Sequence, residues 1–273
     1  MSLTTGPETG GYPARSGVWR GFAVQGRVIH ALILREIQTR FGRNGLGFLW
    51  LFIEPLLLAA VVAVLHWIMY RGDRLPGVPV FLFYLIGYVP YFAFRSIVGR
   101  APAAFQANQT LLFHRQVRFM DVVVARHVLE ALAVLTVILI IVIGTVMIMG
   151  RMPHSIPHLF GGIILMILYA NGLGMIAAAA AGISETAERM VTPLVYFSLP
   201  LSGAFFTLHS MPRWVRDILI WNPQVNMHEM IREGMYGHIT PTYYDVPYVI
   251  VAVAVVNLLG MMAMRAVRPQ LEF

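Results

Sequence analysis

Six stretches of the chain are apolar over lengths that could cross a bilayer, and mostly short polar segments separate them. A membrane-spanning helix needs roughly 20 predominantly apolar residues. The expected spans are Gly47–Tyr70, Val78–Val98, Val128–Met149, His158–Ile183, Val191–Leu208 and Val246–Arg265. No connection between them is large enough to fold as an ordinary soluble enzyme domain. The pattern predicts an all-α integral membrane protein with a six-helix transmembrane domain over residues 46–268.

Two further segments precede the first span. Residues 1–16 are rich in Gly, Pro, Thr and Ser and have no apolar core, which predicts a disordered tail rather than a cleavable signal peptide. Residues 17–45 contain a segment of helical period, Val18–Phe41, with Phe22, Ile29 and Ile33 on one side and Arg20, Arg27 and Gln38 on the other. Such a helix can lie in the membrane interface, with its arginines among anionic headgroups. It could equally pack against the membrane domain, and the two interpretations are compatible.

The segment between the last two spans, residues 209–237, predicts two short helices. Met211-Pro212 is a helix-start signal, and Pro212–Trp221 places Trp214, Ile218 and Trp221 on one apolar face that needs burial. Asn222-Pro223 ends the first helix, and Gln224–Met235 forms the second. Because both are too short to span a bilayer, we expect re-entrant helices at the outer face. The fifth span is itself short and contains two prolines, which suggests a broken helix.

Composition narrows the possible chemistry. Hydrophobic residues make up 58% of the chain and charged residues 12%, and cysteine is absent, so disulfides and thiolate chemistry are excluded. All 20 basic residues are arginine. A P-loop needs a lysine to contact the nucleotide phosphates, and a Schiff-base enzyme needs a lysine amine. If ATP drives this protein, another subunit must therefore hold the ATP and its magnesium, and we expect no cofactor in this chain.

The arginines also indicate an orientation. With six spans both termini lie on one side, and 14 of the 20 arginines then fall in segments on that side. The other six are Arg71, Arg74, Arg151, Arg213, Arg216 and Arg232. Cytoplasmic loops carry an excess of positive charge, so both termini are expected in the cytoplasm.

A few polar and aromatic side chains lie at membrane depth. Glu54, followed by Pro55, is within the first span, and Arg95 and Glu130 lie near span ends. Such groups are costly in lipid and often line a path, but a structural ion pair is an equally reasonable interpretation for Glu54 and the better one for the other two.

Three tyrosines, Tyr84, Tyr88 and Tyr91, share one face of the second span. They could form a slippery stacking surface for sugar rings or simply pack in the core. We regard these two interpretations of the tyrosine face as about equally supported by the sequence.

Several residue strings follow one another in a specific order. They are Phe41-Gly42, Leu46-Gly47-Phe48-Leu49-Trp50, Glu54-Pro55, Ala107-Asn108-Gln109, Ala125-Arg126, Leu129-Glu130, Leu208-His209-Ser210-Met211-Pro212 and Ile220-Trp221-Asn222-Pro223. Together they resemble the permease subunit of bacterial ABC-2-type polysaccharide exporters, most closely the capsular polysaccharide (KpsM-like) branch. The resemblance covers nearly the whole chain beyond the N-terminal tail.

The resemblance implies a homodimer in the bacterial inner membrane that exports a lipid-anchored acidic polysaccharide toward a periplasmic co-polymerase or adaptor. The loop 99–121 would dock on a separate ATP-binding cassette subunit through Phe105, Gln106, Asn108, Gln109 and Leu112. Residues expected to line the channel are Trp50, Glu54, Tyr84, Tyr88, Tyr91, Tyr196 and Phe197. The gate helices within 209–237 would close the periplasmic end through Trp214, Trp221, Asn222 and Pro223, with Arg213, Arg216 and Arg232 attracting the acidic polymer at the exit.

Other functions remain open from the sequence. An O-antigen or teichoic-acid exporter would share this architecture. A membrane-embedded transferase would need clustered acidic or histidine groups, for which the outer segment offers only His228, Glu229 and Glu233 without metal-ligand spacing. A secondary carrier would show paired broken helices in its two halves, whereas only one span looks broken. We expect no nucleic-acid partner, no metal and no catalytic residue in this chain, and we expect membrane lipids around it.

Overall fold

The computed structural model describes residues 17–41, 46–70, 77–104, 119–239 and 241–271, and its regular elements are helices. The α-helices are α1 (Gly17–Phe41), α2 (Leu46–Tyr70), α3 (Val80–Arg100), α5 (Phe119–Met149), α6 (Ile156–Ile183), α7 (Glu185–Ser198), α8 (Arg213–Leu219), α9 (Pro223–Tyr236) and α10 (Val246–Leu271). Short 3-10 turns are η2 (Pro102–Ala104), η4 (Leu199–Leu201) and η5 (Leu208–Ser210). The all-α prediction is confirmed.

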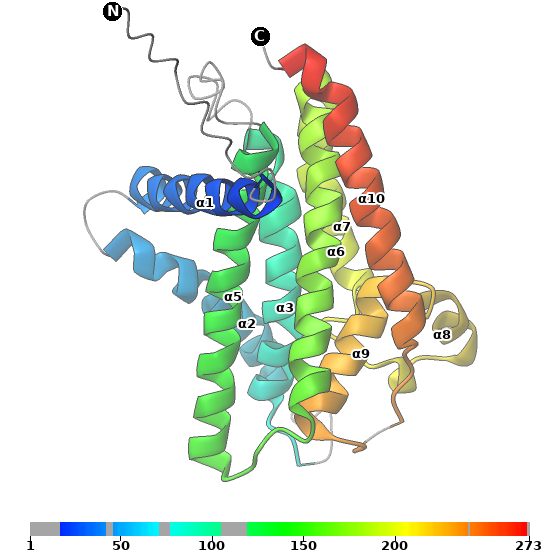
Figure 1. Ribbon diagram of the computed structural model, residues 1–273. Coiled ribbons are helices and arrows are strands. Elements are labelled where there is room, and N and C mark those ends of the chain that lie inside the picture. The colour runs from blue at the N-terminus through cyan, green and yellow to red at the C-terminus, as the bar shows by residue number, and fades with distance from the viewer. Residues whose placement is uncertain (1–16, 42–45, 71–76, 105–118, 240, 272–273) are drawn as a thin grey trace, which may run out of the picture.

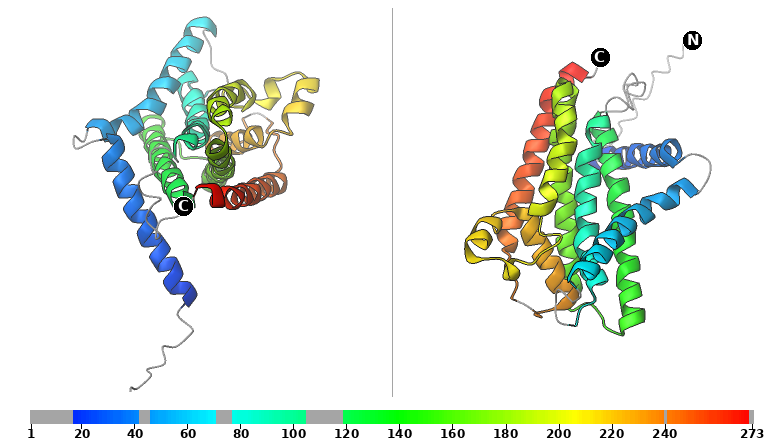
Figure 2. Two further views of the ribbon diagram at one scale, coloured as in Figure 1. Left: turned by 90° about the horizontal axis from the view of Figure 1, so that it is seen from above. Right: turned by 180° about the vertical axis from the view of Figure 1, so that it is seen from behind.

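The long helices run side by side, and α1 lies across one end of them (Figure 1). Helix α2 leans away from α3 and α5 toward this end, which we call the α1 end, and α8 and α9 lie in the opposite half (Figures 1 and 2). Helix α10 ends at the α1 end. Helix α1 and the last residues of α10 therefore lie at the same end of the bundle.

Among the described residues, five helices are long and apolar enough to cross a membrane: α2, α3, α5, α6 and α10. The expected fifth span, Val191–Leu208, is not one continuous helix. Helix α7 ends at Ser198, η4 follows through Pro200, and the chain turns at Gly203, whose φ is 84°. The physical reason is that Pro200 has no N–H to continue the helical hydrogen bonds and Gly203 tolerates a positive φ. The six-span count stays a prediction, and the expected break in this segment is present.

Helix α6 is the centre of the bundle and contacts its neighbours through small residues. The sequence places Ala170, Gly174 and Ala178 at four-residue spacing, and both alanines are fully buried. A Cβ on Gly174 would lie 2.7 Å from the His127 ring of α5, and one on Gly172 would lie 2.8 Å from the Asn257 nitrogen of α10. Helix α6 therefore approaches α5 and α10 closely at these two positions, because glycine has no side chain to hold the helices apart.

Helix α1 packs on the beginning of α5. Leu32 is buried against Val122 and Ala125, and Ile29 and Ile33 lie beside this cluster. The apolar face predicted for α1 thus contacts the membrane domain, while the location of α1 in a membrane interface stays a prediction. Helix α5 begins at Phe119, well before the expected start of the third span, and this extension provides the surface for α1.

Candidate functional site

Arg232 of α9 holds the chain between α7 and η5, residues 199–207, in place. We call these residues the broken segment. Its guanidinium donates to the carbonyl oxygens of Phe206 at 2.7 Å, Gly203 at 2.6 Å and Ala204 at 2.8 Å. It also lies 3.8 Å from the Glu229 carboxylate, and the whole residue is only 3% exposed. A broken helix leaves carbonyls that need donors, and Arg232 supplies them. In this chain the Arg232 guanidinium is used inside the fold, and its expected place at a polymer exit stays a prediction.

The remaining polar side chains of α9 hold the loops on either side. Glu229 accepts the backbone N–H groups of Leu208 at 3.1 Å and Tyr243 at 3.3 Å. Asn226 accepts the backbone N–H of Asp245 at 2.9 Å and donates to carbonyl oxygens that precede α9. Burial, together with the nearby Glu233 carboxylate, raises the pKa of Tyr244 to about 12. Helix α9 is therefore a rigid anchor for both connections.

Helix α9 is also joined to α3. The two ring nitrogens of His228 lie 2.8 Å from the carbonyl oxygen of Gln224 and 2.9 Å from that of Gly87. A Cβ on Gly87 would lie 2.0 Å from the Ala204 carbonyl oxygen, so only glycine fits where the broken segment crosses α3. Of the groups considered for a transferase, His228 and Glu229 thus contact backbone groups, and Glu233 accepts a hydrogen bond from the Thr242 hydroxyl. In the part of the chain that the structure describes, no group of three or more His, Cys, Asp or Glu side chains could hold a metal ion.

Helix α8 differs from α9 in its exposure. Trp214, Ile218 and Trp221 are 71%, 65% and 72% exposed in the single chain, so this chain alone does not bury their shared face. Helix α8 is only seven residues long and lies beside the bundle, not within it (Figure 1). The expected burial of this face at the outer end stays a prediction. Asn222 caps α9 by accepting the Gln224 N–H at 3.0 Å, and Pro223 occupies the first turn of α9. Arg213 is exposed, and Arg216 lies over the Tyr243 ring at 4.6 Å.

The tyrosine face of α3 points into the protein. Tyr84, Tyr88 and Tyr91 are 0%, 4% and 0% exposed. The Tyr91 hydroxyl donates to the Val195 carbonyl at 2.6 Å, and the Tyr88 ring stacks on Phe205 at 6.0 Å between centroids. The core-packing interpretation therefore describes these residues in the single chain. Other residues expected to line a channel are exposed: Trp50, Tyr196 and Phe197 at 56%, 51% and 76%.

Ion pairs gather at the α1 end of the bundle. Glu54 lies 3.4 Å from Arg95 and 3.3 Å from Arg100, and Arg100 also contacts Glu130 at 2.9 Å. Glu54, Arg95 and Glu130 are thus all ion-paired, as the structural interpretation predicts, and a channel-lining role for Glu54 stays a prediction. Arg95 in addition donates to the Tyr88 hydroxyl at 3.0 Å and lies 5.1 Å from the Tyr196 ring centre.

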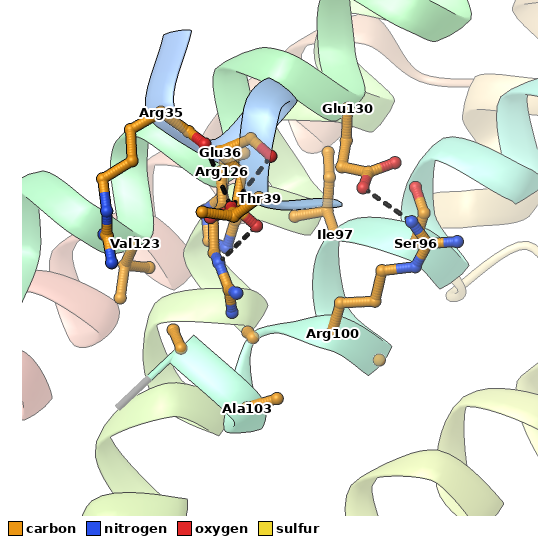
Figure 3. Close-up of a pocket in the computed structure, with 14 residues that line it drawn as sticks. Arg35, Glu36, Thr39, Ser96, Ile97, Arg100, Ala103, Val123, Arg126 and Glu130 are labelled. Atoms are coloured by element: carbon orange, nitrogen blue, oxygen red, sulfur yellow. Dashed lines mark hydrogen bonds and ion pairs between the residues drawn. The ribbon is translucent and has the colours of Figure 1, made fainter. Parts of the chain in front are cut away.

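A cavity of about 440 Å³ lies among these groups, under α1 (Figure 3). Its lining includes Arg35, Glu36, Arg126 and Glu130, and Arg126 contacts Glu36 at 2.9 Å. Figure 3 shows Arg100 and Glu130 reaching toward each other from α3 and α5. The residues expected to dock on an ATP-binding subunit lie outside the described residues; they are Phe105, Gln106, Asn108, Gln109 and Leu112. Within the expected loop 99–121, the structure describes the end of α3, η2 and the beginning of α5.

Comparison with known proteins decides the family. The sequence pattern of the family described as "ABC-2 type transporter" matches residues 27–236. The chain belongs to the ABC-2 type transporter family. The capsule polysaccharide export inner-membrane protein CtrC of Neisseria meningitidis serogroup B is 36% identical over 249 residues, which cover 90% of this chain and 93% of CtrC.

Two further relatives of this ABC-2 protein carry names of the same kind. The capsule polysaccharide export inner-membrane protein BexB of Haemophilus influenzae is 35% identical over 247 residues, covering 90% of this chain and 93% of BexB. The polysialic acid transport protein KpsM of Escherichia coli is 33% identical over 225 residues, covering 81% and 86% of the two chains. The resemblance seen in the residue strings is thereby confirmed over most of the chain.

Sequence reasoning missed two features of the site. It did not assign Arg232 to the broken segment, although a break within an apolar stretch requires a buried donor nearby and Arg232 was a candidate. It also did not pair Glu36 with Arg126, because residues so distant in sequence carry no periodic signal. The linkage between α1 and α5 appears only when the helices are packed.

Proposed function

We propose that this chain is the membrane permease subunit of an ATP-driven exporter of capsular polysaccharide in a bacterial inner membrane. The observation that carries the proposal is the 36% identity to CtrC over 90% of the chain. It is supported by the membership in the ABC-2 family and by the named roles of BexB and KpsM. The absence of lysine supports a separate ATP-binding subunit, since this chain cannot form a P-loop.

Two copies of the chain form the path for the polymer. The exposed aromatic side chains of α2 and α7, including Trp50, Tyr196 and Phe197, suit a path between copies because they are apolar and face away from the core. Helix α8, with Trp214 and exposed Arg213, lies at the periplasmic end. The α1 end faces the cytoplasm, in agreement with the arginine distribution. The polymer leaves toward a periplasmic adaptor.

The ATP-binding subunit docks between α3 and α5 through Phe105, Gln106, Asn108, Gln109 and Leu112. This segment connects α3 to α5 at the α1 end. A movement of the ATP-binding subunit docked there would therefore act directly on these two helices. Replacing Phe105 by alanine should lower export while leaving membrane insertion intact, with Thr110→Ala as the control in the same segment. Full export by the Phe105 variant would place the docking surface elsewhere.

The decisive experiment separates the two subunits. The purified chain should hydrolyse no ATP, and a complex with its co-encoded ATP-binding subunit should hydrolyse ATP. Deleting the chain should trap polysaccharide in the cytoplasm, and sugar analysis of the trapped polymer identifies it. ATP hydrolysis by the isolated chain would contradict the proposal, and a trapped O-antigen or teichoic acid would replace capsule with the alternative substrate.

A further inference from the structure

Both helix ends that flank residues 105–118 are tied to other helices by charged groups. At the end of α3, Arg100 contacts Glu130 of α5 at 2.9 Å and Glu54 of α2 at 3.3 Å. Near the beginning of α5, Arg126 contacts Glu36 of α1 at 2.9 Å. Asp121 of α5 accepts a hydrogen bond from the Gln25 amide of α1. The helices on either side of this segment are therefore linked to α1 and α2 as well as to each other.

The ion pairs contain equal numbers of positive and negative groups. Three carboxylates, on Glu36, Glu54 and Glu130, contact three guanidinium groups, on Arg95, Arg100 and Arg126. The Glu130 side chain is 4% exposed and that of Glu36 is 12% exposed, so each depends on its partner for compensation. Every carboxylate of the set thus has a guanidinium partner, and the cavity beside them is also lined by Arg35. The set is better suited to linking helices than to holding a ligand.

Arg100 is the branch point of the set. One guanidinium nitrogen faces α5 and the other faces α2, so a shift of the α3 end changes both contacts together. Glu54 has a second partner in Arg95, 3.4 Å away, and can remain paired when Arg100 moves. The structure shows Arg100 bridging α2 and α5; a second pairing, with Arg100 on α5 alone, would still leave Glu54 paired with Arg95. A two-state element of this kind is what transmission between distant sites requires.

We propose that Arg100, Glu54 and Glu130 are positioning residues that transmit movement at the cytoplasmic helix ends to α2, with Glu36 and Arg126 extending the linkage to α1. This inference rests on the proposed function, because it assigns the link between ATP hydrolysis and polymer movement. Helix α2 carries the exposed Trp50 and leans away from the other long helices (Figure 2).

The test uses the full complex with its ATP-binding subunit. Arg100→Gln and Glu130→Gln should lower export about tenfold, while ATP hydrolysis stays within about twofold of the unmodified complex. The control is Arg189→Gln, which removes a 3.5 Å ion pair with Glu185. The Arg189 side chain is 81% exposed and that of Glu185 is 85% exposed. This control should change neither activity. Amounts of chain and ATP-binding subunit in the membrane are measured for every variant.

A charge reversal provides the second arm. Glu36→Arg and Arg126→Glu should each lower export, and the double reversal should restore it, since their 2.9 Å contact can form in either polarity. Normal export by Arg100→Gln and Glu130→Gln would overturn the proposal. So would a loss of complex, ATP hydrolysis and export in parallel, which indicates folding alone. If the unmodified complex neither hydrolyses ATP nor exports polysaccharide, the proposed function itself fails, whatever the variants do.

Discussion

Replacing Arg232 with methionine should destabilise the fold without any direct effect on a polymer surface. Methionine keeps the aliphatic packing of the side chain and removes the guanidinium. That guanidinium donates to three carbonyl oxygens at 2.6–2.8 Å and lies 3.8 Å from the buried Glu229. Removing one partner of a buried charge pair costs about 3–5 kcal/mol, because the other charge is left uncompensated. We expect a loss of this size in the free energy of unfolding.

The measurement is thermal unfolding of the detergent-purified chain, followed by tryptophan fluorescence. Arg213→Met is the matched control, since Arg213 is exposed on α8 and should change stability by less than about 0.5 kcal/mol. Adding Glu229→Gln to the Arg232 variant should recover part of the loss, because no buried charge then lacks its partner. A normal melting temperature with abolished export would refute this reasoning and return Arg232 to the polymer path.

Three further outcomes follow from the outer half of the molecule and from α3. A cysteine at exposed Ile218 should react with a membrane-impermeant thiol reagent added from the periplasmic side, and one at fully buried Met227 should not; equal labelling would contradict the packing of α9. Gly87→Ala should prevent folding or strongly reduce its yield, because the new Cβ would meet a backbone carbonyl oxygen 2.0 Å away; a normal melting curve would show that the chain crossing is looser than this. Tyr91→Phe should lower stability by about 1 kcal/mol through loss of its hydroxyl hydrogen bond to α7, with export falling only in proportion to protein amount; a selective export defect would instead favour a sugar-contacting tyrosine.

Much of the architecture followed from the sequence for a physical reason. A bilayer leaves few choices for a long apolar stretch, because its backbone polar groups must be satisfied within the segment. Helices α2, α3, α5, α6 and α10 were predicted on this basis, as were the short helices after the expected fifth span. Pro200 and the Asn222-Pro223 step marked breaks because proline lacks the N–H that a continuing helix uses.

The roles of individual polar and aromatic residues depended on tertiary structure. Periodicity shows that Tyr84, Tyr88 and Tyr91 share one face but does not show what that face meets, and packing against the broken segment and the rest of the core decided it. Arg232 is charged and belongs to a segment that the sequence places at the outer face, which suggested contact with the polymer. In the structure its guanidinium donates to three backbone carbonyl oxygens, which is a structural role. A local pattern determines which surface a helix presents, whereas only the assembled chain determines which partner desolvates that surface and satisfies its charges.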